Sequence, residues 1–321
     1  MTPEFNLIKQ YFTRPTRNTK LGVGDDAALI SLSAGMELAI SADMLVAGTH
    51  FFADADAYKL GWKSLAVNVS DMAAMGANPK WATLAIALPN NDSTWLGQFS
   101  NGFFACAKAF NIDLIGGDTT RGPLTISVQI MGEVPRGLAI KRSSAKVGDD
   151  IWVSGTLGDA ALALAHMQDK VTLPEDEFIS CAKSLHTPQP RVALGLALRD
   201  IANSAIDISD GLLADLGHIL DASKVGAVLQ LQALPKSQAM KNNFPNKLTQ
   251  QMILAGGDDY ELCFTAPVEM QTKIVRLSES LGLQLSHIGH ITQSSGLIVI
   301  GLDNEVLNIK ETGFDHFNQT A

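Results

Sequence analysis

Residues 66–79, Ala-Val-Asn-Val-Ser-Asp-Met-Ala-Ala-Met-Gly-Ala-Asn-Pro, set a single acid in an otherwise uncharged, largely apolar stretch. That acid is Asp71, and the nearest basic residues along the chain are Lys63 and Lys80. A carboxylate packed among Val, Ala and Met is costly unless a partner compensates its charge. Three interpretations stay open: a basic residue distant in sequence, a metal ion, or a role as N-cap or dipole partner of a helix after Ser70. Any fold of this chain has to satisfy one of them.

Length and charge narrow the class of protein. The chain has 321 residues, of which 46% are hydrophobic and 18% charged, which suits one large or two medium-sized domains with proper cores. A net charge of -9 argues against nonspecific binding to nucleic acid or membranes, but not against phosphorylated ligands accompanied by cations. The first twenty residues are polar and mixed, without the apolar region of a secretory signal, and no apolar run approaches the roughly 20 residues that span a bilayer.

The three cysteines are not arranged as metal ligands or disulfide partners. Cys106, Cys181 and Cys263 are far apart in sequence and lie in apolar surroundings. We expect reduced core residues of a cytoplasmic protein, rather than a zinc site or a disulfide framework.

Apolar runs of strand length alternate with longer segments of helical spacing, which predicts a mixed α/β protein. A short amphipathic helix should come first, and then a loop in which Gly22 and Gly24 precede Asp25 and Asp26 and an apolar strand follows. Further strands are expected at residues 36–44, 81–88, 112–115, 124–133, 151–154, 206–208, 225–231, 285–291 and 297–300. Helices are expected at residues 56–69, 93–110, 159–167, 192–203 and 212–223, with Ser93 as an N-cap. Residues 171–184 and 235–249 are polar.

Two further patterns suggest how the chain is divided. Residues 135–150 are basic and contain glycine, so we expect them to connect two domains, residues 1–137 and 138–321. The run 252–264 repeats the local order of 114–120, an apolar segment followed by Gly-Gly-Asp. This echo suggests two similarly built halves.

Aspartates flanked by Gly, Ser or Thr recur at the expected strand ends. Oxygen ligands with small neighbours suit hard cations, Mg²⁺ above all, whereas no His/Cys cluster has the spacing of a zinc site. A single aspartate is more often a cap or a turn residue, but their repetition favours a metal–phosphate centre. The set comprises Asp25, Asp26, Asp43, Asp71, Asp118, Asp207, Asp210, Asp258 and Asp259.

Other signatures of nucleotide or hydrolase chemistry are missing. The sequence contains no G-x-x-x-x-G-K-[ST] loop, no G-x-G-x-x-G opening a helix, no G-x-S-x-G and no S-x-x-K. His50 could act as a general base, although a lone histidine is more often a hydrogen-bonded structural residue.

In their order along the chain, these motifs resemble the thiamine-monophosphate kinase family. The resemblance covers about residues 1–317 and lies within the aminoimidazole ribonucleotide synthetase-like superfamily. It is carried by Gly-Asp-Asp-Ala at 24–27, Ser-Ala-Asp at 41–43, Gly-Thr-His-Phe at 48–51, Asn-Val-Ser-Asp-Met-Ala-Ala-Met-Gly-Ala at 68–77, Gly-Gly-Asp-Thr-Thr-Arg at 116–121, Ser-Gly-Thr-Leu-Gly at 154–158, Asp-Ile-Ser-Asp-Gly at 207–211 and Gly-Gly-Asp-Asp-Tyr-Glu-Leu at 256–262.

The resemblance implies a two-domain α/β fold with mixed sheets, an N-terminal domain that binds ATP and metal, and a homodimer formed through the N-terminal sheet. It implies several Mg²⁺ ions held by Asp26, Ser41, the backbone of Ala42, Asp43, Asp71, Asp118, Asp207 and Asp210. It implies ATP contacts from Gly117, Asp118, Arg142 and Ser209. It implies substrate contacts from His50, Asp258 and Phe314, where Asp258 stands in place of the family's usual Glu.

The implied reaction is phosphorylation of thiamine monophosphate by ATP in the cytoplasm. We expect direct in-line transfer, in which Asp71 bridges metals, Asp43 and Asp118 share them, and Asp207 completes the catalytic acids. Three alternatives remain: another enzyme of the superfamily, such as selenophosphate or aminoimidazole ribonucleotide synthetase; a protein that binds ATP and Mg²⁺ without catalysis; and a structural protein whose aspartates are only caps.

Overall fold

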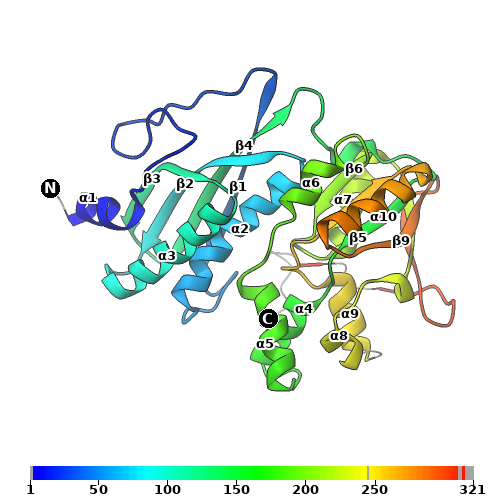
Figure 1. Ribbon diagram of the computed structural model, residues 1–321. Helices are drawn as coiled ribbons and strands as arrows, with labels where there is room; N and C mark the ends of the chain where they lie inside the picture. The colour runs from blue at the N-terminus through cyan, green and yellow to red at the C-terminus, as the bar shows by residue number, and fades with distance from the viewer. Residues whose placement is uncertain (1–2, 244–245, 310–312, 315–321) are drawn as a thin grey trace. The chain divides into compact units, whose positions relative to one another are not determined.

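The computed structural model describes residues 3–243, 246–309 and 313–314, which form two compact units (Figure 1). The first unit comprises Met1–Met72 and Ala77–Gly137, and the second comprises Ala73–Gly76 and Leu138–Ala321. In the described ranges, no helix is both long and apolar enough to cross a membrane.

The N-terminal unit is built on a four-stranded sheet. Its strands lie in the order β1-β4-β2-β3; β4 is antiparallel to both of its neighbours, and β2 and β3 are parallel. The elements are α1 (Pro3–Leu7), the π-helical turn η1 (Ile8–Phe12), β1 (Met36–Val46), α2 (Ala57–Ala74), β2 (Asn78–Leu88), α3 (Ser93–Ala109), β3 (Asp113–Arg121) and β4 (Thr125–Pro135).

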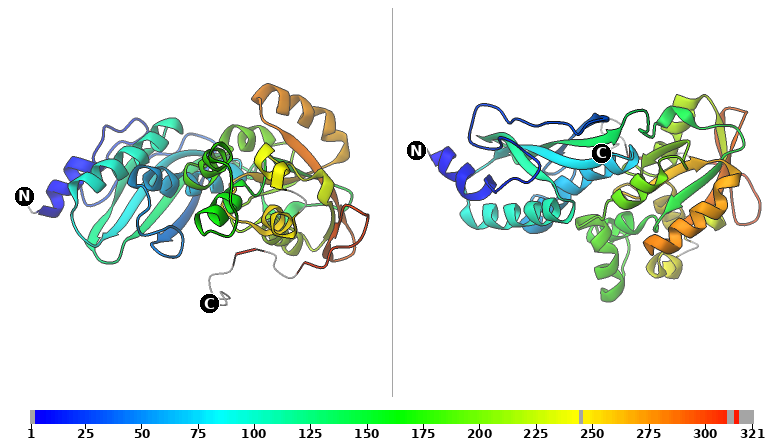
Figure 2. Two further views of the ribbon diagram at one scale, coloured as in Figure 1. Left: turned by 90° about the horizontal axis from the view of Figure 1, so that it is seen from below. Right: turned by 45° about the horizontal axis from the view of Figure 1, so that its top comes forward.

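Helices α2 and α3 cover one face of this sheet (Figures 1 and 2). Along β4, the buried residues Ile126, Val128 and Ile130 alternate with the more exposed Ser127 and Gln129, as expected of a sheet covered on one side. The opposite face is only partly covered: Ala28 and Ile30 pack there against Trp81, Ile115 and Met131.

The two covering helices approach each other closely at two glycines. A Cβ atom on Gly61 would collide with the backbone of Phe99, and one on Gly102 would collide with the carbonyl of Tyr58. Only glycine permits this spacing, which fixes the N-terminal half of α2 against α3.

Two buried acids hold the ends of a long loop in the N-terminal unit. Asp113 accepts hydrogen bonds from the amides of residues 17 and 18, and from the Thr19 hydroxyl at 2.9 Å. Glu133 accepts from the amide and hydroxyl of Ser33, at 2.6 and 3.0 Å, and from the Lys80 ammonium at 2.6 Å. Residues 20–32 run between these two anchors.

The strand expected after Asp26 is not formed in this loop. Leu21 and Leu29 make only an isolated antiparallel bridge, and Val23 bridges Asp25. Most residues of the loop are exposed, and its Ala28 and Ile30 pack against the buried cluster of Trp81, Ile115 and Met131 without forming a strand.

The C-terminal unit contains a six-stranded sheet in the order β10-β7-β9-β5-β8-β6. All neighbouring pairs are antiparallel except β10 and β7. The elements are η2 (Arg142–Ser144), β5 (Asp150–Ser154), α4 (Asp159–Met167), α5 (Glu175–His186), α6 (Val192–Leu198), β6 (Ser204–Asp207), α7 (Leu212–Ser223), β7 (Gly226–Gln230), η3 (Leu231–Ala233), α8 (Gln238–Asn243), α9 (Lys247–Ala255), β8 (Leu262–Ala266), η4 (Val268–Met270), α10 (Gln271–Leu281), β9 (Leu285–Thr292) and β10 (Gly296–Ile300).

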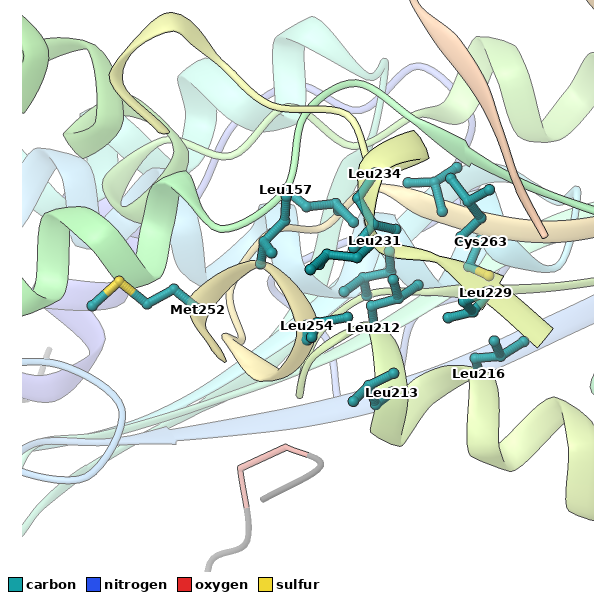
Figure 3. Close-up of a cluster of buried hydrophobic side chains, with 14 of the residues drawn as sticks. Leu157, Leu212, Leu213, Leu216, Leu229, Leu231, Leu234, Met252, Leu254 and Cys263 are labelled. Carbon is teal, nitrogen blue, oxygen red and sulfur yellow. The ribbon is translucent and has the colours of Figure 1, made fainter. Parts of the chain in front are cut away.

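Strand alternation divides the core of this unit into two layers. Val153 of β5 and Cys263 of β8 belong to a large cluster that includes α4, α7 and α9 (Figure 3). Trp152 and Phe264, their neighbours along the same strands, belong to a second cluster with α6 and α10. Because successive side chains of a strand point to opposite faces, helices cover both sides of the sheet.

Several sequence predictions were wrong in position or type. The cap of α3 is Asp92, whose carboxylate accepts from the amides of Thr94 and Trp95, and Ser93 is already helical. The helix expected at 192–203 ends at Leu198. The polar segments 171–184 and 235–249 contain α5, α8 and the start of α9, which bury only a few side chains each.

The supposed internal echo is also wrong. Gly116 and Gly117 lie inside β3, whereas Gly256 follows helix α9, so the two Gly-Gly-Asp motifs occupy different structures. Most of the aspartates likewise do not end strands: Asp43 and Asp118 lie within strands, and only Asp207 closes one. All three cysteines are buried and free, as expected.

Candidate active site

The candidate site residues divide between the two units, and each set is held by contacts within its own unit. Asp71 lies in the last turn of α2, so it is not the N-cap of a helix that begins after Ser70. The C-terminal end of a helix carries partial negative charge, which disfavours an acid by about 0.3–1 kcal/mol. The dipole-partner interpretation is therefore wrong as well, and the position favours a cationic ligand.

Helix α2 holds β1 through two polar side chains one turn apart. The Ser41 hydroxyl donates to Oδ2 of Asp71 at 2.5 Å. The Asn68 amide oxygen accepts from the backbone N–H of Asp43 at 3.1 Å. Ser41 and Asp43, two residues apart on the strand, thus lie on the face that meets the helix. The side chain of Ala42, between them, points to the other face and is exposed.

Asp118 does not join this group within the sheet. The register runs from Asp43 through Val128 and Leu84 to Gly117, three strand spacings or about 14 Å away on the opposite edge. Asp118 is one residue further, in the row of Met44, so it points to the face opposite Asp43. The expectation that Asp43 and Asp118 share an ion within one sheet is not supported.

Gly117 has a backbone conformation that suits glycine. Its φ is 150°, and a Cβ atom there would collide with the carbonyl of Leu84 on β2. The glycine lets β3 lie against β2 directly before Asp118.

Asp26 lies in the loop well before β1, and His50 lies in the turn that follows β1. The backbone amide of Asp26 donates to the Asp25 carboxylate at 2.9 Å in the exposed loop. Nδ1 of His50 accepts from the Val46 amide at 3.0 Å, which fixes the ring. This bond supports a structural role for the ring, and a substrate contact by His50 would use Nε2.

The C-terminal unit brings five expected site residues together. Asp207 closes β6, and the loop after it carries Ser209 and Asp210. The backbone N–H of Asp258 donates to the Ser209 carbonyl at 2.9 Å, and that of Phe314 donates to the Asp210 carbonyl at 3.0 Å. The Phe314 ring is 41% exposed, so it can meet a ligand; residues 315–317 of the motif lie outside the described part.

Asp215 organises the loop that follows Asp207, and no sequence pattern singled it out beyond its place in the first turn of α7. Its buried Oδ2 accepts from the amides of Ser209, Asp210 and Gly211 at 3.0, 3.0 and 3.1 Å. Burial and the neighbouring Asp210 charge raise the pKa of Asp215 to about 7, although the three amides act in the opposite direction.

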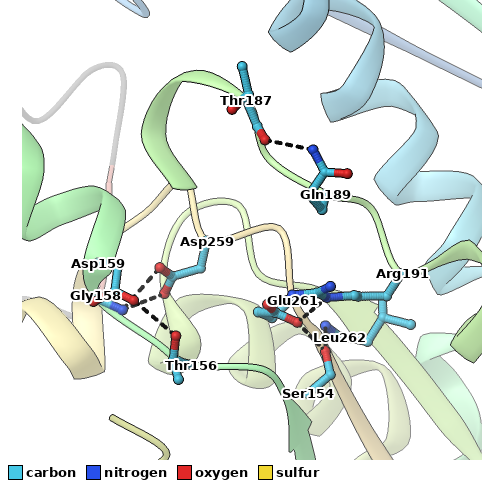
Figure 4. A network of polar contacts seen from close by, with 10 residues as sticks. All are labelled: Ser154, Thr156, Gly158, Asp159, Thr187, Gln189, Arg191, Asp259, Glu261 and Leu262. Atoms are coloured by element: carbon cyan, nitrogen blue, oxygen red, sulfur yellow. Dashed lines mark hydrogen bonds and ion pairs between the residues drawn. The ribbon is translucent and has the colours of Figure 1, made fainter. Parts of the chain in front are cut away.

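A buried salt bridge fixes the segment that carries Asp258 (Figure 4). The Arg191 guanidinium binds both oxygens of Glu261, with Nε at 2.7 Å from Oε2. Ser154 donates to Oε2 at 2.5 Å, and its own oxygen accepts from the Leu262 amide at 2.9 Å. The sequence hint was Tyr-Glu-Leu after Asp259, but pairing across 70 residues could not be inferred.

Arg142 occupies the short turn η2, which packs against α7 and β6. Its carbonyl accepts from the Ser223 hydroxyl at 2.8 Å, and its side chain is exposed. The exposed Arg142 guanidinium is therefore carried by a turn of the C-terminal unit that packs against β6.

No three His, Cys, Asp or Glu side chains within the described residues group as ligands of one metal ion. The donor chemistry nonetheless fits a hard cation, since Ser41, Asp43 and Asp71 offer only oxygens. A complete ligand set would need oxygens beyond these three.

Family models match both units. Residues 24–134 match the AIR synthase related protein N-terminal domain, and residues 146–301 match its C-terminal domain. The thiamine-monophosphate kinase of Salmonella typhimurium is 45% identical over 319 residues, with 98% of each chain covered. The chain belongs to the thiamine-monophosphate kinase family.

Solved structures agree with this membership. The thiamine-monophosphate kinase of Stenotrophomonas maltophilia has a TM-score of 0.84 and 48% identity, covering 90% of this chain and 92% of that one. AaThiL, complexed with AMPPCP and TMP, has a TM-score of 0.79 and 28% identity, covering 98% and 96%. The family therefore accounts for both sheets, and the expected two-domain α/β fold is confirmed.

Proposed function

We propose that this protein transfers the terminal phosphoryl group of ATP to thiamine monophosphate, giving thiamine diphosphate and ADP. The observation that carries the proposal is the full-length similarity to thiamine-monophosphate kinases, at 45% identity over 98% of the chain. The gathering of Asp207, Ser209, Asp210, Asp258 and Phe314 in one unit supports it.

The chemistry suits the residues present. The acceptor is a phosphate monoester whose second pKa is about 6, so its attacking oxygen is already anionic near neutral pH. No strong general base is required, and the fixed His50 ring is consistent with this. The protein's task is to hold two polyanions in line.

We propose that Mg²⁺ ions are bound by Asp26, Ser41, the backbone of Ala42, Asp43, Asp71, Asp118, Asp207 and Asp210, and that Asp43, Asp71, Asp118 and Asp207 are essential for catalysis. Bound Mg²⁺ would neutralise phosphate charge and stabilise the negative charge that develops during transfer. ATP would meet Gly117, Asp118, Arg142 and Ser209, where the exposed Arg142 guanidinium can bind phosphate oxygens. The acceptor would meet His50, Asp258 and Phe314, whose exposed ring can stack on the thiazolium or the pyrimidine.

A homodimer is part of the proposal. Leu38, Ile40 and Met44 are 37%, 56% and 56% exposed along the uncovered face of β1, the face to which Asp118 also belongs. We propose that a second copy covers this face, with residues 1–137 as the metal-, ATP- and dimer-forming domain and 138–321 as the C-terminal domain. Light scattering of Ile40→Glu should show a monomer where the unaltered chain is a dimer.

We place the enzyme in the cytoplasm, where its buried thiols would stay reduced, without nucleic-acid or membrane partners.

The deciding experiment is a coupled ADP-release assay with thiamine monophosphate, free thiamine or hydroxymethylpyrimidine phosphate as acceptor. We expect turnover with the first alone. Turnover confined to either of the others would refute the assignment, and binding of ATP·Mg²⁺ without any turnover would point to a non-catalytic binding protein.

Asp71→Asn tests the metal role, because asparagine can still accept from Ser41 and so preserves the local hydrogen bond. We expect a loss of about 10²-fold or more in turnover with an unchanged circular dichroism spectrum. Asp56→Asn, at the other end of the same helix, is the matched control. Near-normal turnover of Asp71→Asn at limiting Mg²⁺ would exclude the metal role.

A further inference from the structure

The backbone that carries Asp258 is tied to the end of β6. The Asp258 amide donates to the Ser209 carbonyl at 2.9 Å, and the Tyr260 amide donates to the Ile208 carbonyl at 2.8 Å. The Ile208 amide in turn donates to the Glu261 carbonyl at 2.8 Å. These three backbone hydrogen bonds tie the segment to the residues at and after the end of β6, so it is not an open loop.

Two residues of this segment adopt left-handed backbone conformations. Asp258 has a φ of 68° and Tyr260 a φ of 48°, a region disfavoured for residues with a Cβ atom and especially for bulky ones. Such conformations persist where the surroundings over-determine them, and they concentrate at functional sites.

The neighbouring side chains supply this support (Figure 4). Both carboxylate oxygens of Asp259 lie 3.0 Å from the Gly158 amide, at the start of α4. Glu261 is clamped by Arg191 and Ser154. The residues on both sides of Tyr260 are thus anchored through their side chains, and the ring between them is 8% exposed.

The result is a direct contact between the two left-handed residues. The Tyr260 hydroxyl donates to Oδ1 of Asp258 at 3.0 Å. We propose that Tyr260 is a positioning residue for the acceptor substrate, because its phenol holds the Asp258 carboxylate in the orientation that meets the acceptor. This inference rests on the proposed function, and it accounts for how the short Asp258 side chain keeps one orientation, because the phenol restricts it.

If the hydrogen bond between Tyr260 and Asp258 positions the acceptor, its loss should change the affinity for the acceptor substrate. The Tyr260 hydroxyl contacts Asp258, the residue that we propose binds the acceptor. Loss of the phenol should therefore weaken the acceptor's affinity selectively.

The test is Tyr260→Phe, which keeps the ring and removes only the hydroxyl. We expect the KM for thiamine monophosphate to rise about tenfold, the effect of one charge-assisted hydrogen bond, with the KM for ATP within about twofold. Calorimetric titration of thiamine monophosphate in the presence of AMPPCP should show the same loss without turnover. Tyr58→Phe, which removes a hydroxyl from α2 in the other unit, is the matched control.

A double-mutant cycle shows whether the phenol acts through Asp258. In the Asp258→Ala background, Tyr260→Phe should cause no further rise in the KM for thiamine monophosphate, because the group it orients is gone. Additive effects of the two substitutions, an unchanged KM in Tyr260→Phe, or equal rises for both substrates would overturn the inference. If the unaltered protein neither binds nor phosphorylates thiamine monophosphate, the proposed function fails, and this inference fails with it.

Discussion

The salt bridge between Arg191 and Glu261 offers the sharpest energetic prediction. The Glu261 side chain is 7% exposed and that of Arg191 is 27% exposed. In Arg191→Met the apolar stem is kept, but Glu261 loses its two guanidinium contacts and retains the Ser154 hydroxyl. The substitution therefore leaves a buried carboxylate with one neutral donor.

The magnitude follows from that burial. Removing one partner of a buried ion pair costs about 3–5 kcal/mol, whereas exposed pairs contribute about 0–1 kcal/mol. Because water reaches the Arg191 side of this pair, we expect the lower end, about 3 kcal/mol. At about 2–4 °C per kcal/mol for a unit of this size, the melting temperature of the C-terminal unit should fall by about 6–12 °C.

Thermal unfolding followed by circular dichroism gives the shift, and hydrogen exchange localises it. Exchange should accelerate in peptides spanning 204–212 and 256–266, since their backbones are paired. Lys80→Met breaks a comparably buried pair in the N-terminal unit and should leave these peptides unchanged. The reasoning would be refuted if Arg191→Met lowered the free energy of unfolding by less than about 1 kcal/mol. Equal acceleration of hydrogen exchange in these peptides in both variants would also refute it.

Three further predictions concern single residues. Burial raises the pKa of Asp215 to about 7, so the folded protein keeps a proton that the unfolded chain releases above about pH 4. The free energy of unfolding, measured by urea titration in EDTA, should therefore fall as the pH rises from 4 to 7. Asp215→Asn should flatten that pH profile. Asp92→Ala should cost about 1 kcal/mol by urea unfolding because it removes the cap of α3, whereas Ser93→Ala should change little. Gly117→Ala should lower both stability and ATP affinity, measured by calorimetry, because its Cβ atom meets the Leu84 carbonyl; a variant with unchanged ATP affinity would separate Gly117 from the nucleotide site.

Local patterns predicted much of the fold, and tertiary packing decided the rest. The strand 36–44 and the helix 56–69 were visible because their apolar spacing is regular, and the structure extends them to Val46 and Ala74. Helix α5 was missed because only Cys181 and Leu185 are buried along it, which leaves a polar sequence. Apolar residues 252–254 belong to a helix and not to a strand, an ambiguity that short apolar runs always carry.

In the candidate site, too, local motifs could be predicted from the sequence, whereas their tertiary contacts could not. The motif residues of the C-terminal unit could be predicted as a group, and the structure brings them together. Their supports could not be predicted, because Asp215, Arg191 and Glu261 act through hydrogen bonds that only the folded chain creates. The sequence also could not reveal that Asp43 and Asp118 point to opposite faces, since that depends on register across four strands.

The two acids that anchor the loop of residues 20–32 have a consequence for how this chain can vary. Asp113 and Glu133 fix where the loop leaves and rejoins the sheet, whatever residues lie between. Doubling the length of such a loop adds only about 0.6 kcal/mol of closure entropy. Insertions and deletions there should therefore be tolerated in natural variants as long as Asp26 can still reach its ligand, while the anchors themselves cannot be exchanged singly.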